Sequence, residues 1–328
     1  MSVISVSSLT KHFNGIKAVD GVSFEVREGT IFGFLGPNGA GKTTTISILC
    51  TLLKPTSGTA IVNGYNCLTE SAQVRSSIGV VFQDMTLDKD LTAYENLLYH
   101  AILYNVEKSK RERVVNDALK FMDLYERKDD LVKRFSGGMK RRLEVARAVV
   151  HQPRILFLDE PTLGLDPQSR NNLWEFITRL PNEKGVTIFM TTHYMEEAEV
   201  CQEIAIIDRG KIIASGSPDE LKKTVGGDVI YLRTTDNEKA LRIIREEMSL
   251  KGKVSGDELF ITVSRGDACL PELIRQLGEM VKSVRVQRPT LNDVFLTLTG
   301  KEIRPETVDA ADEVREAVRA YRRRFDRT

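Results

Sequence analysis

One glycine-rich stretch carries a lysine and a threonine at the spacing that phosphate binding requires. Its residues are Gly36, Pro37, Asn38, Gly39, Ala40, Gly41, Lys42, Thr43 and Thr44, and they fit the pattern G-x-x-x-x-G-K-[ST]. In such a loop the small residues let backbone N–H groups turn toward phosphate oxygens, and the following helix adds its dipole. Lys42 supplies the charge for the β- and γ-phosphates, and the Thr43 hydroxyl is placed to hold Mg²⁺. The stretch therefore predicts a site for a nucleoside triphosphate.

Two adjacent carboxylates, Asp159 and Glu160, follow the apolar run 155–158. Taken alone, two acids at the end of a strand could equally be surface caps. In a chain that also has a phosphate loop, phosphoryl transfer requires an aspartate that holds the metal and a group that orients the attacking water. We therefore expect Asp159 to reach the Mg²⁺ region and Glu160 to activate a water molecule.

Two other polar residues also fall where apolar runs end. Gln83 follows the run 78–82, and His193 lies shortly after the run 186–190. Considered singly, each would be an ordinary surface glutamine or core histidine. The active groups of a parallel sheet gather at the carboxyl ends of its strands. Both residues are therefore expected beside the phosphate loop and Asp159.

The triplet Ser136, Gly137 and Gly138 precedes a segment with helical spacing. A serine in this position is typical of a helix N-cap, and the glycines would form an exposed helix N-terminus. An S-G-G triplet alone is common and mostly structural. Its position shortly before Asp159, in a chain with a phosphate loop, makes the combination highly specific.

Apolar runs that alternate with helical segments predict the elements that position these residues. Runs typical of buried strands cover 30–35, 78–82, 155–158, 186–190 and 204–208, and helices are expected at 46–53, 167–180 and 194–200. This alternation predicts an α/β fold with a parallel sheet covered on both faces. Residues 3–9 and 21–27 add a small antiparallel β subdomain. From about 90 to 150 the spacing is helical throughout, which predicts an all-helical insertion.

We expect three parts along the chain, at 1–225, 226–300 and 301–328. The second part shows strands at 229–233 and 283–286, two short strands around 256, and helices at 238–248 and 270–280. This β-α-β-β-α-β order predicts a small ferredoxin-like α+β domain, followed by a helix at 292–298. The third part is a basic amphipathic helix. Such a tail could lie on an anionic membrane surface or a partner, or it could pack on its own domain or fray.

The composition is that of an ordinary soluble globular protein, with 41% hydrophobic and 28% charged residues. The net charge of +1 gives no global field for nucleic acid, so we expect no nucleic-acid partner. The four cysteines are scattered and indicate reduced thiols rather than a metal site. We expect no signal peptide and no membrane span. The predicted location is the cytosol or the surface of a membrane protein.

Together these motifs resemble the ATP-binding cassette (ABC) family over residues 1–225. They are the P-loop, the S-G-G signature, the strand ending Asp159-Glu160-Pro161, then Gly164-Leu165-Asp166 and Thr192-His193. Phe135 and Met139 stand where the common signature has Leu and Gln, a departure that removes no catalytic group. The amino-acid sequences of residues 33–40 and 291–300 are similar to those of the daunorubicin-resistance-type (ABC-2) exporters, whose cassettes carry a small C-terminal domain.

The resemblance implies a P-loop ATPase in which two cassettes face head to tail, each ATP lying between one P-loop and the signature of the other. It implies Mg²⁺ bound by Thr43, Gln83 and Asp159, and catalysis by Glu160, His193, Gln83 and Lys42. Phe13 would stack on adenine, and Asp166 would couple the two sites. Ser136, Gly137 and Gly138 would bind the γ-phosphate of the second copy or of a homologous cassette.

We weigh three functions on these observations. The first is the ATP-hydrolysing subunit of a membrane exporter, bound at the cytoplasmic face to a separately encoded permease. The alternative is a cytosolic ABC ATPase acting on DNA or the ribosome. Two observations disfavour this alternative. Only about 95 residues separate the P-loop from the signature, without the sustained heptads of the long coiled coil that DNA-acting members need. No second P-loop is found, whereas ribosome-acting members carry two cassettes in one chain. A third, a switch without turnover, is disfavoured by Glu160 and His193. The transported substrate is not encoded in these motifs.

Overall fold

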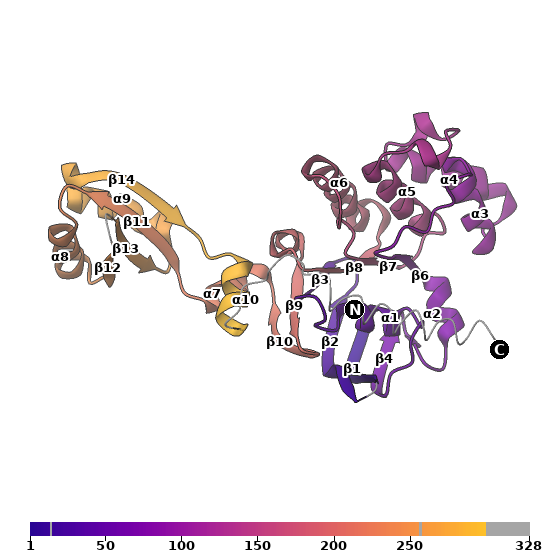
Figure 1. Ribbon diagram of the computed structural model, residues 1–328, viewed down its shortest axis with the longest axis horizontal. Helices are drawn as coiled ribbons and strands as arrows, with labels where there is room; N and C mark the ends of the chain where they lie inside the picture. Colours follow the sequence, from indigo (N-terminus) through magenta and orange to yellow (C-terminus); the bar gives the residue numbers. More distant parts are fainter. Residues whose placement is uncertain (14, 256–257, 300–328) are drawn as a thin grey trace. The chain divides into compact units, whose positions relative to one another are not determined.

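A computed structural model describes residues 1–13, 15–255 and 258–299 of the chain (Figure 1). The described residues form two compact units, Met1–Gly216 and 217–299. The basic tail expected at 301–328 lies outside the described residues. Among the helices that the structure describes, none combines the length and the apolar character needed to cross a membrane.

A six-stranded sheet forms the centre of the first unit, in the order β10-β9-β3-β8-β7-β6. Its strands are β3 (Ile31–Leu35), β6 (Ile78–Val81), β7 (Ile155–Asp159), β8 (Thr187–Thr192), β9 (Glu203–Asp208) and β10 (Lys211–Gly216). The strands β6, β7, β8, β3 and β9 are parallel, and β10 is antiparallel to β9. Every residue of β3, β7 and β8 is buried. The expected α/β fold is confirmed.

A second, antiparallel sheet covers one side of the first unit in the order β2-β1-β4-β5. Its strands are β1 (Ser2–Phe13), β2 (Ile16–Arg27), β4 (Ser57–Val62) and β5 (Tyr65–Asn66). The helix α1 (Lys42–Leu49) shares one apolar core with both sheets, and α2 (Ser71–Ser77) adds Val74 to it. The rings of Phe24, Phe32 and Phe189 stack within this core. These contacts hold the start of α1 at the end of β3.

The helices of the insertion lie on the other side of the central sheet (Figure 1). They are α3 (Ala93–Leu103), α4 (Lys108–Phe121), α5 (Gly137–Val149) and two short 3-10 helices, Tyr125–Arg127 and Val132–Arg134. The structure describes 90–150 throughout and places no strand there, as expected. Helix α6 (Pro167–Lys184) lies beside α5. The helix expected at 194–200 is a 3-10 helix, Met195–Val200, since its backbone bonds span three residues rather than four.

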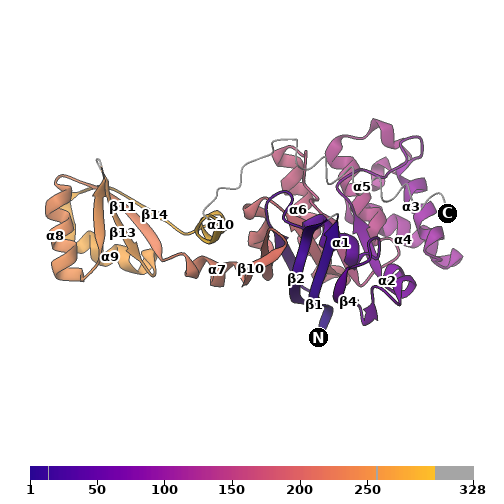
Figure 2. The same cartoon turned by 60° about the horizontal axis from the view of Figure 1, so that its bottom comes forward.

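The second unit contains the expected ferredoxin-like arrangement (Figure 2). Its elements are β11 (Asp228–Thr234), α8 (Asn237–Met248), β12 (Gly252–Ser255), β13 (Glu258–Val263), α9 (Gly266–Leu277) and β14 (Val281–Gln287). A short 3-10 helix, Gly278–Met280, connects α9 to β14. The antiparallel sheet has the order β12-β13-β11-β14, so β11 lies between two strands that come later in the chain. Both helices share one apolar core with this sheet.

Two features of the second unit differ from the sequence-based expectation. Helix α9 begins at Gly266 rather than near 270, because the carboxylate of Asp228 accepts the Gly266 N–H at 2.7 Å. The unit begins at Ser217 rather than at 226. The reason is that α7 (Pro218–Thr224) packs on the last described helix, α10 (Leu291–Thr299).

Candidate active site

The phosphate loop connects β3 to α1, and at two of its glycines the backbone is packed too closely for a side chain. A Cβ atom at Gly36 would collide with the carbonyl oxygen of Ile207 at the end of β9. Gly41 has φ 111° and would collide with the carbonyl of Ala18. The available space therefore requires both glycines, and at Gly41 the positive φ favours glycine as well. The loop is fixed against the sheet, and α1 begins at Lys42.

The Lys42 ammonium is held inside this loop, with only 4% of the residue exposed. Its Nζ donates to the carbonyls of Gly36 at 2.7 Å and Pro37 at 3.1 Å, and it lies 3.3 Å from Oε1 of Glu160. Burial lowers the pKa of Lys42, although the Glu160 carboxylate opposes this shift. A buried cation surrounded by a glycine-rich backbone is suited to bind phosphate oxygens.

Asp159 ends β7 and lies close to Thr43, the second residue of α1. The Thr43 hydroxyl is 3.5 Å from Oδ1 of Asp159, which also accepts a hydrogen bond from the Thr191 hydroxyl at 2.6 Å. Burial raises the pKa of the Asp159 carboxyl, and the neighbouring Glu160 adds to this shift. A hydroxyl and a carboxylate are the hard oxygen ligands that Mg²⁺ prefers when phosphates complete its coordination. The pair fits that ion.

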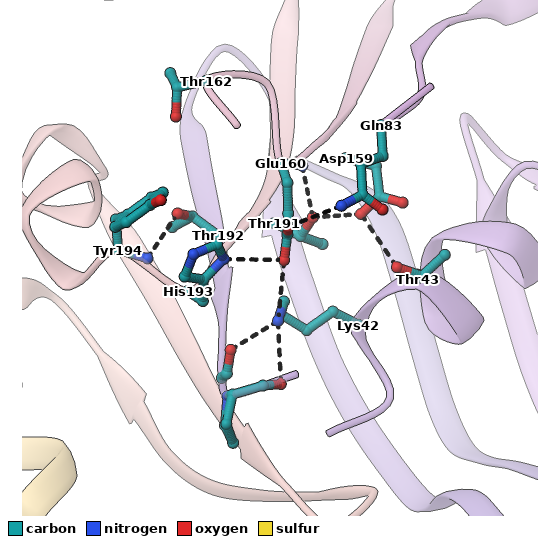
Figure 3. A network of polar contacts seen from close by, with 12 residues as sticks. Lys42, Thr43, Gln83, Asp159, Glu160, Thr162, Thr191, Thr192, His193 and Tyr194 are labelled. Atoms are coloured by element: carbon teal, nitrogen blue, oxygen red, sulfur yellow. Dashed lines mark hydrogen bonds and ion pairs between the residues drawn. The ribbon is translucent and has the colours of Figure 1, made fainter. Parts of the chain in front are cut away.

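Glu160 follows β7 in a left-handed backbone conformation, with φ 47°. Its N–H donates to the carbonyl oxygen and to the hydroxyl of Thr191, at 3.2 and 3.1 Å. The carboxylate lies 3.2 Å from Nδ1 of His193 and accepts from Nε2 of Gln83 at 3.4 Å, as Figure 3 shows. The five side chains of Lys42, Gln83, Asp159, Glu160 and His193 thus lie in one network, as the sequence predicted.

The two adjacent carboxyls have opposite pKa shifts. Burial alone would raise the pKa of Glu160, but its contacts with His193 and Lys42 outweigh burial and lower it. Asp159 is shifted upward by its own burial. Adjacent acids whose environments separate their pKa values are typical of acid–base sites. Glu160 is ionised at neutral pH and can accept a proton from water.

The raised pKa of Asp159 predicts a pH-dependent gain in stability for Asp159→Asn. The ionised carboxyl destabilises the fold, so this cost is absent at low pH and grows as the pH rises through the folded pKa. Asparagine keeps an acceptor for Thr191 without the charge. In urea unfolding with a chelator, we expect the variant to exceed the parent at pH 7 by about 1.4 kcal/mol per unit of pKa difference. An equal difference at pH 4 would show that charge is not the cause.

Glu197, a residue that the sequence analysis did not select, fixes the segment before His193. Its buried carboxylate accepts from the hydroxyls of Thr162 and of Thr192, the latter at 2.7 Å. The Thr192 hydroxyl also accepts the N–H of Tyr194 at 2.9 Å. Glu197 therefore joins the chain after Glu160 to the chain around His193. In the sequence it is one of three glutamates, at 196, 197 and 199, and nothing local distinguishes it from the other two.

The other predicted residues lie outside the network drawn in Figure 3. Ser136 is exposed and caps α5, where its hydroxyl accepts the Met139 N–H at 3.2 Å. Asp166 caps α6 by accepting the Ser169 N–H at 2.9 Å. Phe13 ends β1, and the Lys11 ammonium lies 5.1 Å from the centre of its ring. Their predicted roles toward nucleotide and partner remain proposals.

Gly138, in the signature helix α5, packs closely against Ser169 at the start of α6. A Cβ atom here would lie 2.5 Å from Oγ and 2.8 Å from Cβ of Ser169, whereas a Cβ at Gly137 would meet nothing within 4 Å. We therefore expect Gly138→Ala to lower the free energy of unfolding by about 1–3 kcal/mol. The control Gly137→Ala should leave the free energy of unfolding unchanged or raise it slightly. Urea denaturation measures both, and equal values for the two variants would contradict this packing.

The fold and the site together define a P-loop ATPase of the ATP-binding cassette class. Comparison with family models agrees, because the ABC transporter model matches residues 19–163. The model for the C-terminal domain of DrrA1-3-like ATP-binding proteins matches residues 216–299. The chain belongs to the family of ABC transporter ATP-binding proteins, and to its branch with a DrrA-like C-terminal domain. It is a transport-coupled ATPase that binds ATP and hydrolyses it.

Known relatives are similar along almost the whole chain. The daunorubicin/doxorubicin resistance ATP-binding protein DrrA of Streptomyces peucetius is 38% identical, covering 94% of this chain and 96% of its own. The Nod factor export ATP-binding protein I of Ralstonia nicotianae is 40% identical, covering 92% and 95%. Among solved structures, a dimeric ATP-binding cassette in a post-hydrolysis state, bound to ADP and Pi, is 26% identical. It has a TM-score of 0.60 and covers 65% of this chain and 98% of its own.

Proposed function

We propose that two copies of this chain pair head to tail on ATP and separate after hydrolysis, driving a permease encoded as a separate chain. The observation that carries this proposal is the location of the signature. Ser136 and Gly137 are exposed at the N-terminus of α5, while Lys42 and Glu160 lie in a buried network. An exposed helix N-terminus attracts anions. The signature is therefore free to contact a nucleotide held by the P-loop of another copy.

Within each site we assign roles to the residues of the network. Lys42 and the loop N–H groups hold the phosphates, and Glu160 accepts a proton from the attacking water. His193, which lies 3.2 Å from Glu160, contacts the γ-phosphate. Thr43, Asp159 and Gln83 hold Mg²⁺, which supplies charge neutralisation when it is bound. Phe13 stacks on adenine, and Asp166 links the two sites across the dimer.

The proposed partner is a membrane-embedded permease, which places this chain at the cytoplasmic face of the membrane as a peripheral subunit. The names of two relatives support this assignment, because one is a daunorubicin/doxorubicin resistance ATP-binding protein and the other is a Nod factor export ATP-binding protein. We propose transport out of the cell on the same basis. These relatives differ in cargo, so their names do not define the substrate of this chain.

A mixing experiment tests whether each site is shared between two copies. Lys42→Ala inactivates the P-loop, and Ser136→Arg blocks the signature, so each variant alone should lack ATPase activity. In a hybrid dimer, one site combines both defects and the other is intact. An equal mixture should regain about a quarter of the parental turnover, because half of the random dimers are hybrids with one intact site. A mixture as inactive as its components would contradict the shared site.

A further inference from the structure

Arg141 is a buried residue of the signature helix that reaches the chain around Glu160. Only 3% of Arg141 is exposed. Its Nε donates to the carbonyl of Pro161 at 2.6 Å, and Nη2 donates to the carbonyl of Glu160 at 3.1 Å and lies 3.5 Å from that of Asp159. Three consecutive carbonyls at the end of β7 are thus bound to one side chain of α5.

The contacts of Arg141 hold Glu160 in its unusual backbone conformation. A non-glycine residue with positive φ persists only where its surroundings hold it, and such residues concentrate at functional sites. The N–H of Glu160 is bound by Thr191, and its carbonyl is bound by Arg141. The residue is therefore fastened on both sides. The direction of its carboxylate depends on both contacts.

The same guanidinium also binds the strand end that precedes Gln83. Nη1 of Arg141 donates to the carbonyl of Phe82 at 2.7 Å and to Oε2 of Glu144 at 2.9 Å. The other carboxylate oxygen of Glu144, which is 2% exposed, accepts the Thr86 N–H at 2.8 Å. The Arg141–Glu144 pair thus contacts the chain on both sides of Gln83.

Side chains of α5 therefore contact two parts of the active site. Arg147, a further turn along α5, donates to the carbonyl of Thr86 at 2.9 Å. The N-terminus of the same helix carries Ser136 to Gly138. A movement of this rigid helix would be transmitted to Phe82, Thr86 and Glu160 through these hydrogen bonds.

We propose that Arg141 is a positioning residue for Glu160, and that the Arg141–Glu144 pair couples the signature helix to Glu160 and to the segment around Gln83. This inference rests on the proposed role of Glu160 as the base. All five N–H groups of Arg141 have acceptors here, and its planar fork sets their directions. A lysine at this position would keep the charge, but its single ammonium cannot bind the carbonyls on both chain segments.

The test compares Arg141→Lys with Arg142→Lys, the same substitution at the neighbouring residue, whose guanidinium contacts the carbonyl of Met122 instead. We expect Arg141→Lys to lower kcat by about 10–100-fold, since small misplacements of a catalytic group have effects of this size. The KM for ATP and ATP-dependent dimerisation should stay within about twofold of the parent, because the phosphate loop is unchanged. Equal kcat values for the two variants would overturn the proposal.

A second measurement separates positioning from general damage to the fold. In a Glu160→Gln background, single-turnover phosphate release should fall less than about threefold on adding Arg141→Lys, because the group being positioned is already inactive. An equal loss in both backgrounds would overturn the proposal. Full turnover by Glu160→Gln alone would instead refute the proposed base.

If Arg141→Lys does not fold, Glu144→Gln provides a milder test of the same contacts. Its amide oxygen can still accept the Thr86 N–H, but Arg141 loses its charged partner. We expect kcat to fall by about 3–10-fold at unchanged KM, in line with the loss of one charge-assisted hydrogen bond. A parental kcat for this variant, with the protein folded, would overturn the coupling role of the pair.

Discussion

Glu160→Gln is expected to slow ATP turnover by about 10²–10⁴-fold, the usual effect of losing a general base. ATP-dependent dimerisation of the chain should be retained. Glutamine has nearly the same shape but cannot accept the proton of the attacking water. His193 and Lys42 contact the Glu160 carboxylate and lower its pKa, which keeps it ionised and able to accept a proton. Single-turnover phosphate release measures the first effect. Size-exclusion chromatography with light scattering measures the second.

The matched control is Glu183→Gln, an exposed glutamate of α6 whose partner is Arg179. This change should leave both turnover and association at parental values, because exposed ion pairs contribute little. A Glu160→Gln protein that remains monomeric with ATP would contradict the proposed dimer. One that retains parental turnover would show that another group activates the water.

Lys42→Ala is expected to reduce ATP affinity by about 10²-fold or more, as removal of a buried, charge-assisted hydrogen-bond partner usually does. The ammonium is buried against the carbonyls of Gly36 and Pro37 and pairs with the Glu160 carboxylate. Isothermal titration calorimetry with a non-hydrolysable ATP analogue measures the affinity. The variant must first show a cooperative thermal transition, which establishes that it is folded.

Lys54→Ala serves as the control for this measurement, because Lys54 is exposed and follows α1 rather than starting it. Its ATP affinity should equal that of the parent. If Lys42→Ala binds the analogue as tightly as Lys54→Ala does, then the phosphate loop does not hold the nucleotide through this lysine.

The site residues that could be predicted from the sequence are those that their immediate neighbours in the chain identify. Lys42 ends a glycine-rich loop that follows a strand, and Asp159, Glu160 and His193 follow apolar runs. Because parallel strands end at one edge of a sheet, the position of each run was enough to predict that these side chains meet. The structure places them in one network with Gln83 (Figure 3).

The residues that sequence reasoning missed act through contacts with distant parts of the chain. Arg141 looks like one of several charged residues on a helix, and nothing nearby indicates that it binds Phe82 and Glu160. Glu197 likewise contacts Thr162, far from it in sequence. Periodicity indicates which residues are buried or exposed, but it does not specify which carbonyl a buried charge meets. The start of the second unit at Ser217 also depends on packing, between α7 and α10.

The left-handed backbone of Glu160 places a conformational cost at the residue proposed to activate water. Such a conformation costs about 1–3 kcal/mol in a residue with a side chain, and glycine adopts it without this cost. Glycine at 160 would, however, also remove the carboxylate that pairs with the buried Lys42 ammonium. The gain in the backbone is therefore opposed by the loss of an ion pair in the phosphate-binding loop. Efforts to stabilise this protein should keep position 160 fixed and vary residues away from the network.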